Sequence, residues 1–495
     1  MLSTQKRHER DPHLDSLADP TLLREFAYIN GEWCSGENDA RTDVYNPANG
    51  VWLGSVASMS AEQSRNAVHL ANAAFEAWSR KLPQERGKIL DRWYDLMMEA
   101  KEDLAILMTA EQGKPLAESR GEVNYGASFL KWFSEEGKRV YGDIIPQTPD
   151  RRGLVIKQPI GVVAAVTPWN FPNAMITRKI APALAAGCTV VLKPSEIAPQ
   201  TAFILAEILD GTDLPKGVFN MVCGYGHTVG DTLIKHPDVR MVSFTGSTRT
   251  GNLIAHAAAD DFKRFALEMG GKSASVILPD ADLAAAVKGT INNCLLNSGQ
   301  TCTALTRMLV PADKHDEACE LAAAAVAKMT PGNPLEETTR LGPLSSAQQR
   351  DKVIDYIKLG IQEGAKLIAG GPEAPEGCEK GYFVKATVFG NVKPDSRIAQ
   401  EEIFGPVLCV IPYNDEAEAV KIANGTQYGL SGAVWSGDDA KAKKIASKLR
   451  TGQVFVNGGA FNPMAPFGGF GHSGIGREFG KWGLEEFLEI RSLQL

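Results

Sequence analysis

The sequence predicts an α/β protein with two α/β domains and an extended β arm. Short β-branched runs such as "GVVAAVT", "TVVLKP", "VFNMV" and "MVSFTG" alternate with helical or loop stretches in the first half of the chain. A second alternation runs from "RMLVP" to "QVFVNGG" and includes alanine-rich helices such as "ACELAAAAVAKM". Strands that alternate with helices imply right-handed crossovers and parallel sheets. At 495 residues the chain is too long for one ordinary core, and we expect the break between the domains near residue 270.

The N-terminal region begins with charged residues and continues with helices. The opening "MLSTQKRHERDPHLDS" has no apolar segment, so we expect a flexible arm over residues 1–24 and no secretory signal. "FAYINGEW" carries Asn30-Gly31, a strong hairpin turn signal. Ser60 and Gln63 form a capping box at the start of "SAEQSRNAVHLANAAFEAW", and helical patterns continue to about residue 140.

Two extended segments lie outside the two alternations. Residues 142–160, which begin "GDIIPQTPDRRGLVIKQP", are typical of a β-ribbon arm. The tail "LEEFLEIRSLQL" ends in a strand-like run. Unpaired strands of this kind suggest pairing with another subunit.

Composition and charge exclude several classes of function. An apolar content of 44% and a charged content of 22% are those of a soluble globular protein. Lys+Arg 52 against Asp+Glu 59 gives 52 − 59 = −7, which argues against a nucleic-acid or anionic-membrane partner. No apolar run is long enough to span a bilayer. The eight cysteines form no CxxC pair, so we expect no metal, no disulfide framework, and a cytoplasmic protein with reduced thiols.

Three segments that follow predicted strands are candidates for binding a nucleotide. The glycine segment at residues 222–231, "VCGYGHTVGD", is one residue too long for the dinucleotide fingerprint. "FTGSTRTG" places Gly246 and Ser247 at a strand-to-helix turn, where free N–H groups can bind phosphate, although many such turns bind nothing. "LKPSE" contributes Lys193 and Glu196, which either bind ribose hydroxyls or form an exposed ion pair.

A thiol, a carboxyl and an amide lie in unusual surroundings. Cys302 lies in "NSGQTCTALTR", a small-residue loop rather than the apolar run of a buried structural cysteine. Glu268 lies among apolar residues in "FALEMGG", where desolvation should raise its pKa toward a value useful for a general base. Asn170 lies between aromatic residues in "TPWNFP", and a fixed amide can stabilise an oxyanion. Each has an ordinary structural explanation alone; together they predict thiolate attack on a carbonyl, hydride loss and hydrolysis.

With these motifs in order, the sequence closely resembles the aldehyde dehydrogenase superfamily over residues 25–495. The resemblance rests on "PWNFP", "LKPSE", "FTGS", "LEMGGK", "GQTCTALTR", "EEIFGPV" and "NPMAPFGGFGHSGIGRE". It implies a Rossmann-type NAD-binding domain over residues 25–140 and 161–269, a catalytic α/β domain over residues 270–477, and β-ribbon oligomerisation elements over residues 141–160 and 478–495. A homodimer or homotetramer is therefore expected.

The resemblance implies catalytic and cofactor roles for the matching residues. Cys302 is the expected nucleophile, and Glu268 is the expected base that activates water. The Asn170 side chain and the Cys302 backbone N–H form the expected oxyanion hole, while Lys179 and Glu478 form a proton relay. The segment 222–231 then becomes a structural loop. The expected cofactor is NAD, and NADP is less favoured because its 2′-phosphate would meet the Glu196 carboxylate. The residues expected to bind the cofactor are Thr167, Trp169, Lys193, Ser195, Glu196, Gly246, Ser247, Glu402 and Phe404.

The expected substrate is an aldehyde with a polar or acidic far end. "NAMITRKIAPALAAGCTVVLKP" and "SFLKWFSEEGKRVYGDIIP" resemble the succinate-semialdehyde dehydrogenase branch. Arg178 either binds a carboxylate bidentately or is a surface or relay-supporting charge. That branch usually has an arginine where this chain has Leu296, and a serine in the loop that here contains Phe461. We therefore expect a longer or partly aromatic semialdehyde, with succinate semialdehyde as one candidate. The expected substrate-binding residues are Arg178, Phe171, Leu296, Thr301, Thr303, Phe461 and Phe467.

Three alternatives remain open at this point. One is a general medium-chain or aromatic aldehyde dehydrogenase. A CoA-acylating dehydrogenase needs no water-activating base, so Glu268 weighs against it. A cysteine hydrolase needs a histidine partner, and the motifs contain only His472 in a glycine loop. Some relatives carry a second cysteine two residues beyond the nucleophile; that position is Ala304 here, so we expect no inactivating disulfide in this loop.

Overall fold

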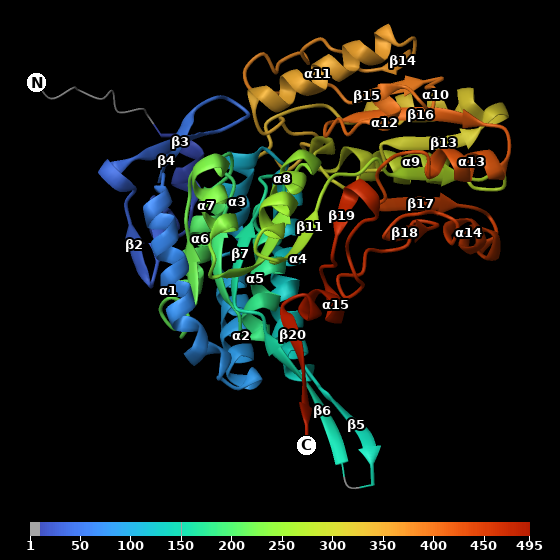
Figure 1. Cartoon of the computed structure of the whole chain (residues 1–495). Helices are drawn as coiled ribbons and strands as arrows, with labels where there is room; N and C mark the ends of the chain where they lie inside the picture. Colours follow the sequence, from blue (N-terminus) through green and yellow to red (C-terminus); the bar gives the residue numbers. More distant parts are fainter. Residues whose placement is uncertain (1–9, 150) are drawn as a thin grey trace, which may run out of the picture.

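The computed structural model describes residues 10–149 and 151–495, and the predicted α/β architecture is confirmed (Figure 1). The first sheet has eight strands in the order β19-β11-β10-β7-β8-β9-β1-β2. Its parallel strands are β7 (Val162–Val166), β8 (Thr189–Lys193), β9 (Phe219–Met221), β10 (Val239–Thr245) and β11 (Arg264–Glu268). Antiparallel strands complete its two edges: β1 (Ala27–Ile29), β2 (Glu32–Cys34) and β19 (Gly474–Ile475).

The connections of this sheet create a switch point. From β7 the chain proceeds to β8 and β9 on one side, and later returns to the other side of β7 with β10 and β11. In open α/β sheets, ligands bind outside the carboxyl ends of the strands at such a point. The space beyond β7 and β10 is therefore where a nucleotide is expected.

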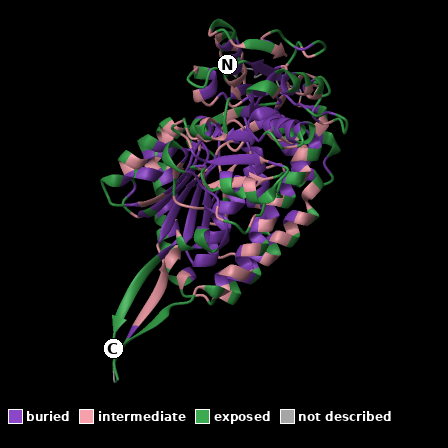
Figure 2. Cartoon of the chain, turned by 90° about the vertical axis from the view of Figure 1, so that its right-hand side faces the viewer, coloured by how far each residue is buried: buried purple, intermediate pink, exposed green. Residues whose placement is uncertain are grey.

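Helices cover both faces of the first sheet because its central strands are apolar on both sides. Val163 and Ala165 of β7 pack with helices on one face, whereas Val162 and Ala164 point to the other. The helices of the first face are α2 (Pro83–Glu99), α3 (Lys101–Gln112), α4 (Leu116–Glu136), α5 (Ala174–Ala186) and α6 (Gln200–Asp210). Those of the second are α1 (Ala61–Ser79), α7 (Asp231–Lys235) and α8 (Thr248–Ala259). Figure 2 shows the buried strands between these layers.

The chain passes to the second sheet between Glu268 and Ala274. This sheet has seven strands in the order β14-β15-β16-β13-β12-β17-β18. The strands are β12 (Ala274–Ile277), β13 (Arg307–Pro311), β14 (Lys366–Ala369), β15 (Thr387–Gly390), β16 (Val407–Tyr413), β17 (Ser431–Trp435) and β18 (Gln453–Val456). The helices around it are α9 (Leu283–Leu295), α10 (His315–Val326), α11 (Ala347–Gln362), α12 (Arg397–Gln400), α13 (Glu416–Ala423) and α14 (Asp439–Ala446).

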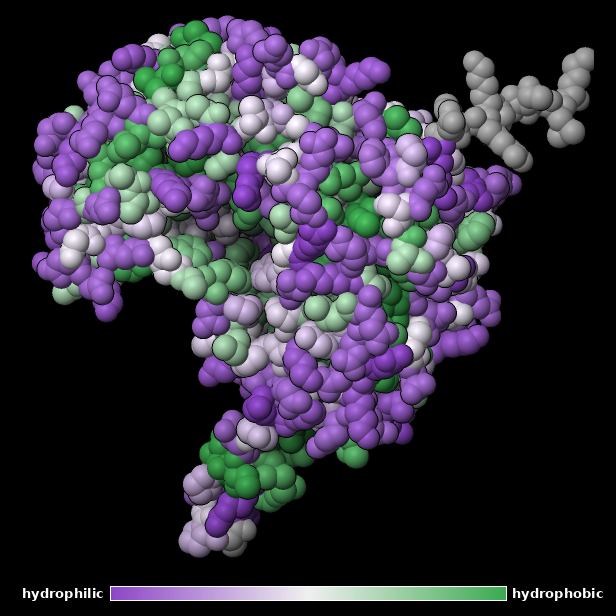
Figure 3. All heavy atoms as spheres, turned by 180° about the vertical axis from the view of Figure 1, so that it is seen from behind, coloured by the Kyte–Doolittle hydropathy of each residue, from purple (hydrophilic) through white to green (hydrophobic). Residues whose placement is uncertain are grey.

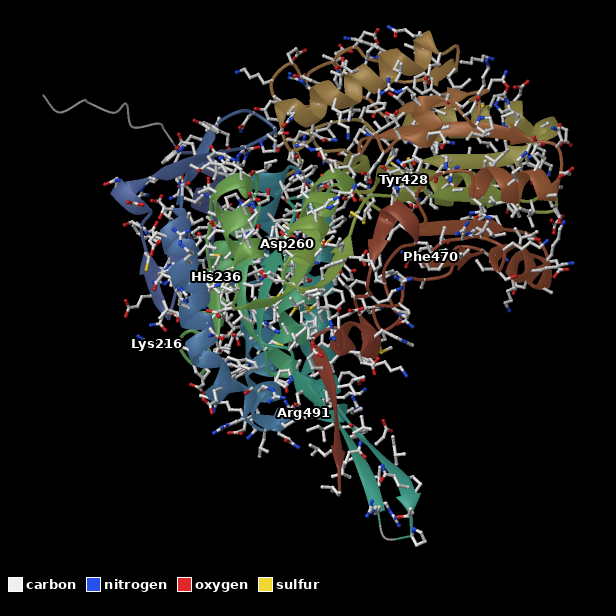
Figure 4. All side chains as sticks on the ribbon, viewed as in Figure 1. Lys216, His236, Asp260, Tyr428, Phe470 and Arg491 are labelled. Atoms are coloured by element: carbon white, nitrogen blue, oxygen red, sulfur yellow. The ribbon has the colours of Figure 1, made fainter. Side chains whose placement is uncertain are left out.

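A three-stranded sheet projects away from the rest of the chain as an arm (Figure 1). Its strands are β5 (Asp143–Thr148), β6 (Arg151–Pro159) and β20 (Leu488–Gln494), and β20 follows α15 (Gly480–Glu485). The two segments that the sequence marks as extended thus pair with each other within one chain. Figure 4 shows Arg491 of β20 on this arm.

Two local predictions are confirmed. The β1–β2 hairpin turns at Asn30 and Gly31, whose φ values of 55° and 74° are those a two-residue turn of this type requires. Ser60 caps α1 by accepting the Gln63 N–H, and the Gln63 side chain accepts the Ser60 N–H in return at 3.1 Å. A second hairpin, β3 (Arg41–Tyr45) with β4 (Trp52–Ala57), forms a small separate sheet.

The prediction of a flexible arm over residues 1–24 is wrong for the described part, residues 10–24. Two short 3-10 turns, Pro12–Ser16 and Pro20–Leu22, lie against the body of the protein. Asp11 is fully buried and accepts the Asn46 side-chain N–H at 2.9 Å. Leucines at positions 14, 17 and 22 belong to the core. The prediction failed because these leucines are spaced among charged residues and form no continuous apolar run. Residues 1–9 lie outside the described residues. Within the described ranges, no helix is long and apolar enough to cross a membrane.

Candidate active site

The loop that carries Cys302 is held in a strained conformation. It follows α9 and begins with a turn over Leu296–Gly299, in which three consecutive residues have positive φ values of 52°, 54° and 74°. Non-glycine residues adopt this left-handed region only at a cost, so neighbours must hold them there. Glu118 accepts the Asn297 N–H at 2.8 Å, and the Ser298 hydroxyl donates to a backbone carbonyl at 2.8 Å. Partners far away in the sequence therefore fix the loop.

Two adjacent glycines allow three segments to meet at Cys302. A Cβ atom on Gly271 would lie 2.5 Å from the Cys302 carbonyl oxygen, and one on Gly270 would collide with the Glu402 carboxylate. The Gly271 N–H donates to Glu402 Oε1 at 2.9 Å. Because Gly270 and Gly271 lie two and three residues beyond Glu268, which ends β11, the close approach brings the predicted base near the predicted nucleophile.

The thiol and the base both hold their protons tightly. Burial raises the pKa of Cys302 to about 12, and the positive charge of Arg178 opposes this rise. Burial raises the pKa of Glu268 well above its ordinary value, and the nearby negative charge of Glu478 adds to this. One Glu268 oxygen, Oε2, is buried without a hydrogen-bond partner among the described residues. A raised pKa makes the carboxylate a stronger base, which suits a residue expected to activate water.

Asn170 is fixed at both its side chain and its backbone. Its Nδ2 donates to the carbonyl of Gln300, two residues before Cys302, at 3.0 Å. Its own carbonyl accepts from Asn297 Nδ2 at 2.8 Å and from Lys114 Nζ at 2.7 Å. An Asn amide has two N–H groups, so one anchors the side chain while the second is available to an oxyanion.

A buried ion cluster lies behind the predicted base. Lys179 Nζ and Glu478 Oε1 are 2.5 Å apart, and Arg178 Nε and Glu478 Oε2 are 2.6 Å apart. The Arg178 guanidinium also lies 5.1 Å from the Phe467 ring centroid and 5.5 Å from that of Phe479. Burial lowers the pKa of Lys179, although the carboxylate opposes this. The charge of Arg178 is therefore already paired within the protein.

A cavity of about 550 Å³ opens onto Cys302. Its wall contains all the residues that the sequence assigned to the substrate: Arg178, Phe171, Leu296, Thr301, Thr303, Phe461 and Phe467. The sequence did not identify Tyr125, Met175, Asn293, Trp435, Gln453 and Phe455. Tyr125 lies in the middle of α4, where an aromatic residue is ordinarily a core residue, and only the packing of α4 against the site distinguishes it. The wall is mostly apolar.

Of the nine residues predicted to bind the cofactor, seven lie at or just beyond the carboxyl ends of β7, β8 and β10 in the first sheet, whereas Glu402 and Phe404 lie between α12 and β16. Thr167 directly follows β7, Lys193 ends β8, Ser247 follows β10 and Glu268 ends β11. These strand ends lie side by side, because the paired residues are Val166 with Lys193, Val166 with Phe244, and Thr245 with Glu268. Thr167 Oγ1 is buried and has no hydrogen-bond partner among the described residues, so it can serve a ligand.

The two glycine segments differ in structure. Gly246 forms the turn after β10, and its N–H donates to the carbonyl of Glu268 at 3.0 Å. Ser247 caps α8 by accepting the Thr250 N–H at 3.2 Å, which places a helix N-terminus at the switch point. The glycine segment at residues 222–231 instead makes a π-helical turn, Gly226–Gly230, that leads into α7.

Lys193, the last residue of β8, forms an ion pair of 3.2 Å with Glu196 in the loop that follows. Lys193 is buried, whereas the Glu196 side chain is 36% exposed and can be reached by a ligand. Ser195 accepts a backbone N–H from two residues further on at 3.2 Å. Trp169 and Phe404, two residues that the sequence assigned to the cofactor, meet edge to face with ring centroids 5.5 Å apart.

Comparison with known proteins matches the chain to one family over almost its whole length. Residues 33–493 match the family model described as the aldehyde dehydrogenase family. The glutarate-semialdehyde dehydrogenase of Pseudomonas aeruginosa is 45% identical over 97% of this chain and 99% of that protein. The NADP(+) succinate-semialdehyde dehydrogenase of Escherichia coli is 44% identical over 96% of this chain and 98% of that protein. A solved structure of an aldehyde dehydrogenase C mutant from Pseudomonas syringae, with NAD+ and octanal, has a TM-score of 0.92 and 42% identity, and covers 98% of both chains.

Proposed function

The chain belongs to the aldehyde dehydrogenase family and catalyses NAD(P)-dependent oxidation of an aldehyde to the carboxylic acid, and we propose that Cys302 is its nucleophile and Glu268 its base. The observation that supports this most strongly is the close packing of Gly271 on the Cys302 carbonyl. This packing supports the proposal because it brings the end of β11, which carries the buried Glu268, close to the loop that carries Cys302, and Cys302 lines the cavity.

In the first half of the reaction, Cys302 Sγ bonds to the aldehyde carbon and the carbonyl electron pair moves to oxygen. Asn170 Nδ2 and the Cys302 backbone N–H donate to that oxyanion. The thiol proton is released to water, so the attacking species is the thiolate. When bound, the oxidised nicotinamide supplies the acceptor for the hydride that the tetrahedral carbon loses.

In the second half, water hydrolyses the thioester that remains on Cys302. Glu268 removes a proton from this water, which then attacks the carbonyl, and the carbon–sulfur bond breaks to release the acid. Lys179 and Glu478 lie behind Glu268, so they offer a route by which its proton leaves the buried site. The raised pKa of Glu268 suits a group that must gain and lose a proton in every cycle.

The residues at the switch point fit a dinucleotide. The α8 N-terminus at Ser247 would hold the pyrophosphate, and Lys193 and Glu196 would hold the adenosine ribose. Glu402, held by the Gly271 N–H, would hold the nicotinamide ribose. We propose that NAD is preferred to NADP, because the Glu196 carboxylate repels a 2′-phosphate.

The proposed substrate is a semialdehyde whose far end is polar. The relatives that act on glutarate semialdehyde and succinate semialdehyde support this class. The cavity favours a longer or partly aromatic member, because Phe171, Phe455 and Phe461 line it.

One observation favours a second candidate, a general medium-chain or aromatic aldehyde. Glu478 already pairs with Arg178, which weakens the attraction of that guanidinium for a substrate carboxylate. The structure of the Pseudomonas syringae relative contains octanal.

A kinetic panel tests the substrate class, with succinate semialdehyde, glutarate semialdehyde, hexanal and benzaldehyde. Following NADH formation with and without CoA also distinguishes hydrolysis from CoA acylation. We expect no requirement for CoA and no activity in Cys302→Ala. A higher kcat/KM for hexanal than for both semialdehydes would support the second candidate, and retained activity in Cys302→Ala would overturn the proposed nucleophile.

We further propose that the arm mediates homo-oligomerisation. Ile144, Leu154 and Leu493 are neighbours across the arm and share one face. Ile144 is 70% exposed, and hydrophobic residues gather on the arm in Figure 3. An exposed apolar row on a sheet that projects from the molecule is suited to contact with a second copy.

A further inference from the structure

A buried ion pair lies at the junction of α3 and α4, outside the catalytic cluster. Lys114 follows α3, and Glu122 lies in the second turn of α4. Both side chains are only 1% exposed, and Lys114 Nζ donates to Glu122 Oε2. Burying two charges is costly unless both are paired and their remaining polar atoms are hydrogen-bonded, so the other partners of this pair are informative.

The pair holds the segment that contains Asn170 from two sides. Lys114 Nζ donates to the Asn170 carbonyl at 2.7 Å and lies 4.0 Å from the Phe171 ring centroid. Glu122 Oε1 accepts the N–H groups of Asn173 and Ala174, where α5 begins, at 2.9 and 3.1 Å. A cation thus binds the carbonyl end of this turn, and a carboxylate binds its amide end.

The same junction also reaches the Cys302 loop. Gln112 accepts the Lys114 backbone N–H at 2.9 Å through Oε1, and its Nε2 donates to Asn297 Oδ1 at 3.0 Å. Asn297 Nδ2 in turn donates to the carbonyls of Asn170 and Gln300 at 2.8 and 3.3 Å. The backbone of Asn170 is therefore fixed relative to the Cys302 loop by side chains that do not line the cavity, and its side-chain amide is anchored to the same loop through the Gln300 carbonyl.

We propose that Lys114 and Glu122 are positioning residues that hold the Asn170 amide where the oxyanion forms. This inference rests on the proposed oxyanion role of Asn170. Neither residue touches the reacting atoms, so both act through Asn170. Their loss should slow formation and collapse of the tetrahedral species while Cys302 remains accessible.

A double-mutant cycle tests this dependence. The doubly substituted chain Lys114→Met with Glu122→Gln removes both charges together and leaves no unpaired one. In the otherwise native enzyme we expect this double substitution to lower the rate of the first NADH turnover about tenfold. This loss is smaller than the loss of about 10²–10³-fold expected for Asn170→Ala alone. In an Asn170→Ala background we expect the same pair of substitutions to change that rate less than about twofold, because the Asn170 amide through which Lys114 and Glu122 act is already absent.

Three controls separate positioning from folding. Lys263 is an equally buried lysine that donates to the His236 and Val239 carbonyls, so Lys263→Gln should lower Tm and leave the first-turnover rate unchanged. The rate of Cys302 alkylation should be unchanged in the Lys114 and Glu122 variant. If that variant does not fold, Lys114→Arg in both backgrounds provides the same comparison, with a smaller loss expected because the charge is kept.

The outcomes are distinguishable from one another. Asn170→Ala with the full rate would overturn the oxyanion role of Asn170 and this proposal with it. If Asn170→Ala is slow and the Lys114 and Glu122 substitutions slow it tenfold further, only the positioning role is overturned. A folded Lys114 and Glu122 variant with the full first-turnover rate would also overturn the positioning role alone.

Discussion

At the scale of single residues, the proposed nucleophile Cys302 is half-buried and the proposed base Glu268 is buried. Burial favours the neutral forms of Cys302 and Glu268, because a charge loses its hydration in an apolar site. Arg178 opposes this for the thiol, and the cluster of Lys179 and Glu478 lies behind the carboxyl. The neighbours of these residues therefore govern reactivity as much as the two residues themselves.

The pKa of Cys302 has a direct consequence for alkylation. The thiolate is the reactive form, so with a pKa of about 12 the rate of iodoacetamide labelling should rise about tenfold per pH unit between roughly pH 7 and 9. Arg178→Gln removes a positive charge that lowers this pKa, so labelling at a given pH should be slower. Arg24→Gln, which breaks the partly exposed pair with Glu207, is the control. A labelling rate that reaches a plateau below pH 8 would contradict this assignment.

Glu196 should determine cofactor preference. Glu196→Gln removes the charge that opposes a 2′-phosphate, so the ratio of kcat/KM with NAD to that with NADP should fall about fivefold to tenfold. Lys193 remains to pair with the phosphate. Glu207→Gln, on α6 and paired with Arg24, should leave the ratio unchanged. An unaltered ratio in Glu196→Gln would remove Glu196 from the ribose site.

At the scale of elements, strand ends and loops determine how the site is assembled. Gly270 and Gly271 let the end of β11 approach the Cys302 loop closely, and the left-handed turn at Leu296–Gly299 directs that loop. The geometry therefore depends on close contact between backbones as well as on side chains.

Gly271→Ala tests this contact. Its Cβ would lie 2.5 Å from the Cys302 carbonyl oxygen, so the loop must move by roughly 1 Å, and a shift of that size can cost about 10²-fold in kcat/KM. Cofactor binding, measured by quenching of protein fluorescence, should change little. Gly121→Ala, in α4 with open space around it, should keep full activity. Full activity in Gly271→Ala would mean that the two segments are not rigidly packed.

Local sequence patterns predicted the elements better than their long-range partners. The Ser60–Gln63 cap and the Asn30-Gly31 turn depend on a few neighbouring residues, so the sequence was sufficient to predict them. Lys114 and Glu122 resemble ordinary surface charges in the sequence, because only the packing of α4 against α5 buries them. The same limit applies to residues 10–24, whose burial depends on Asn46 and Asp103.

At the scale of the whole molecule, two α/β units share one site and the arm carries the surface proposed for self-association. Glu268 comes from the first sheet, whereas Cys302 and Glu402 belong to segments of the second. Glu478 lies between β19 and α15, on the path to the arm. Contacts made by the arm are therefore connected through a short segment to the ion cluster behind the base.

Substituting one exposed residue of the arm tests its role in assembly. Ile144→Lys places a charge in the apolar row with Leu154 and Leu493, so the oligomer should dissociate to smaller species in light scattering after size exclusion. Ile361→Lys, at an exposed apolar position on α11, is the matched control and should leave the mass unchanged. A monomeric native protein would contradict the proposal outright.

The central claim is that oxidation proceeds through an acyl group on Cys302 that Glu268 helps to hydrolyse. Its most direct test is intact-mass spectrometry of Glu268→Gln, quenched after mixing with NAD and either glutarate semialdehyde or octanal. We expect a burst of one NADH per active site, then little turnover at any pH, and an adduct on Cys302 equal to the aldehyde mass minus two hydrogens. In the native enzyme, turnover limited by hydrolysis should instead rise with pH, because the carboxylate is the active form and its pKa is raised. Normal turnover in Glu268→Gln, or a burst without an adduct on Cys302, would contradict this mechanism.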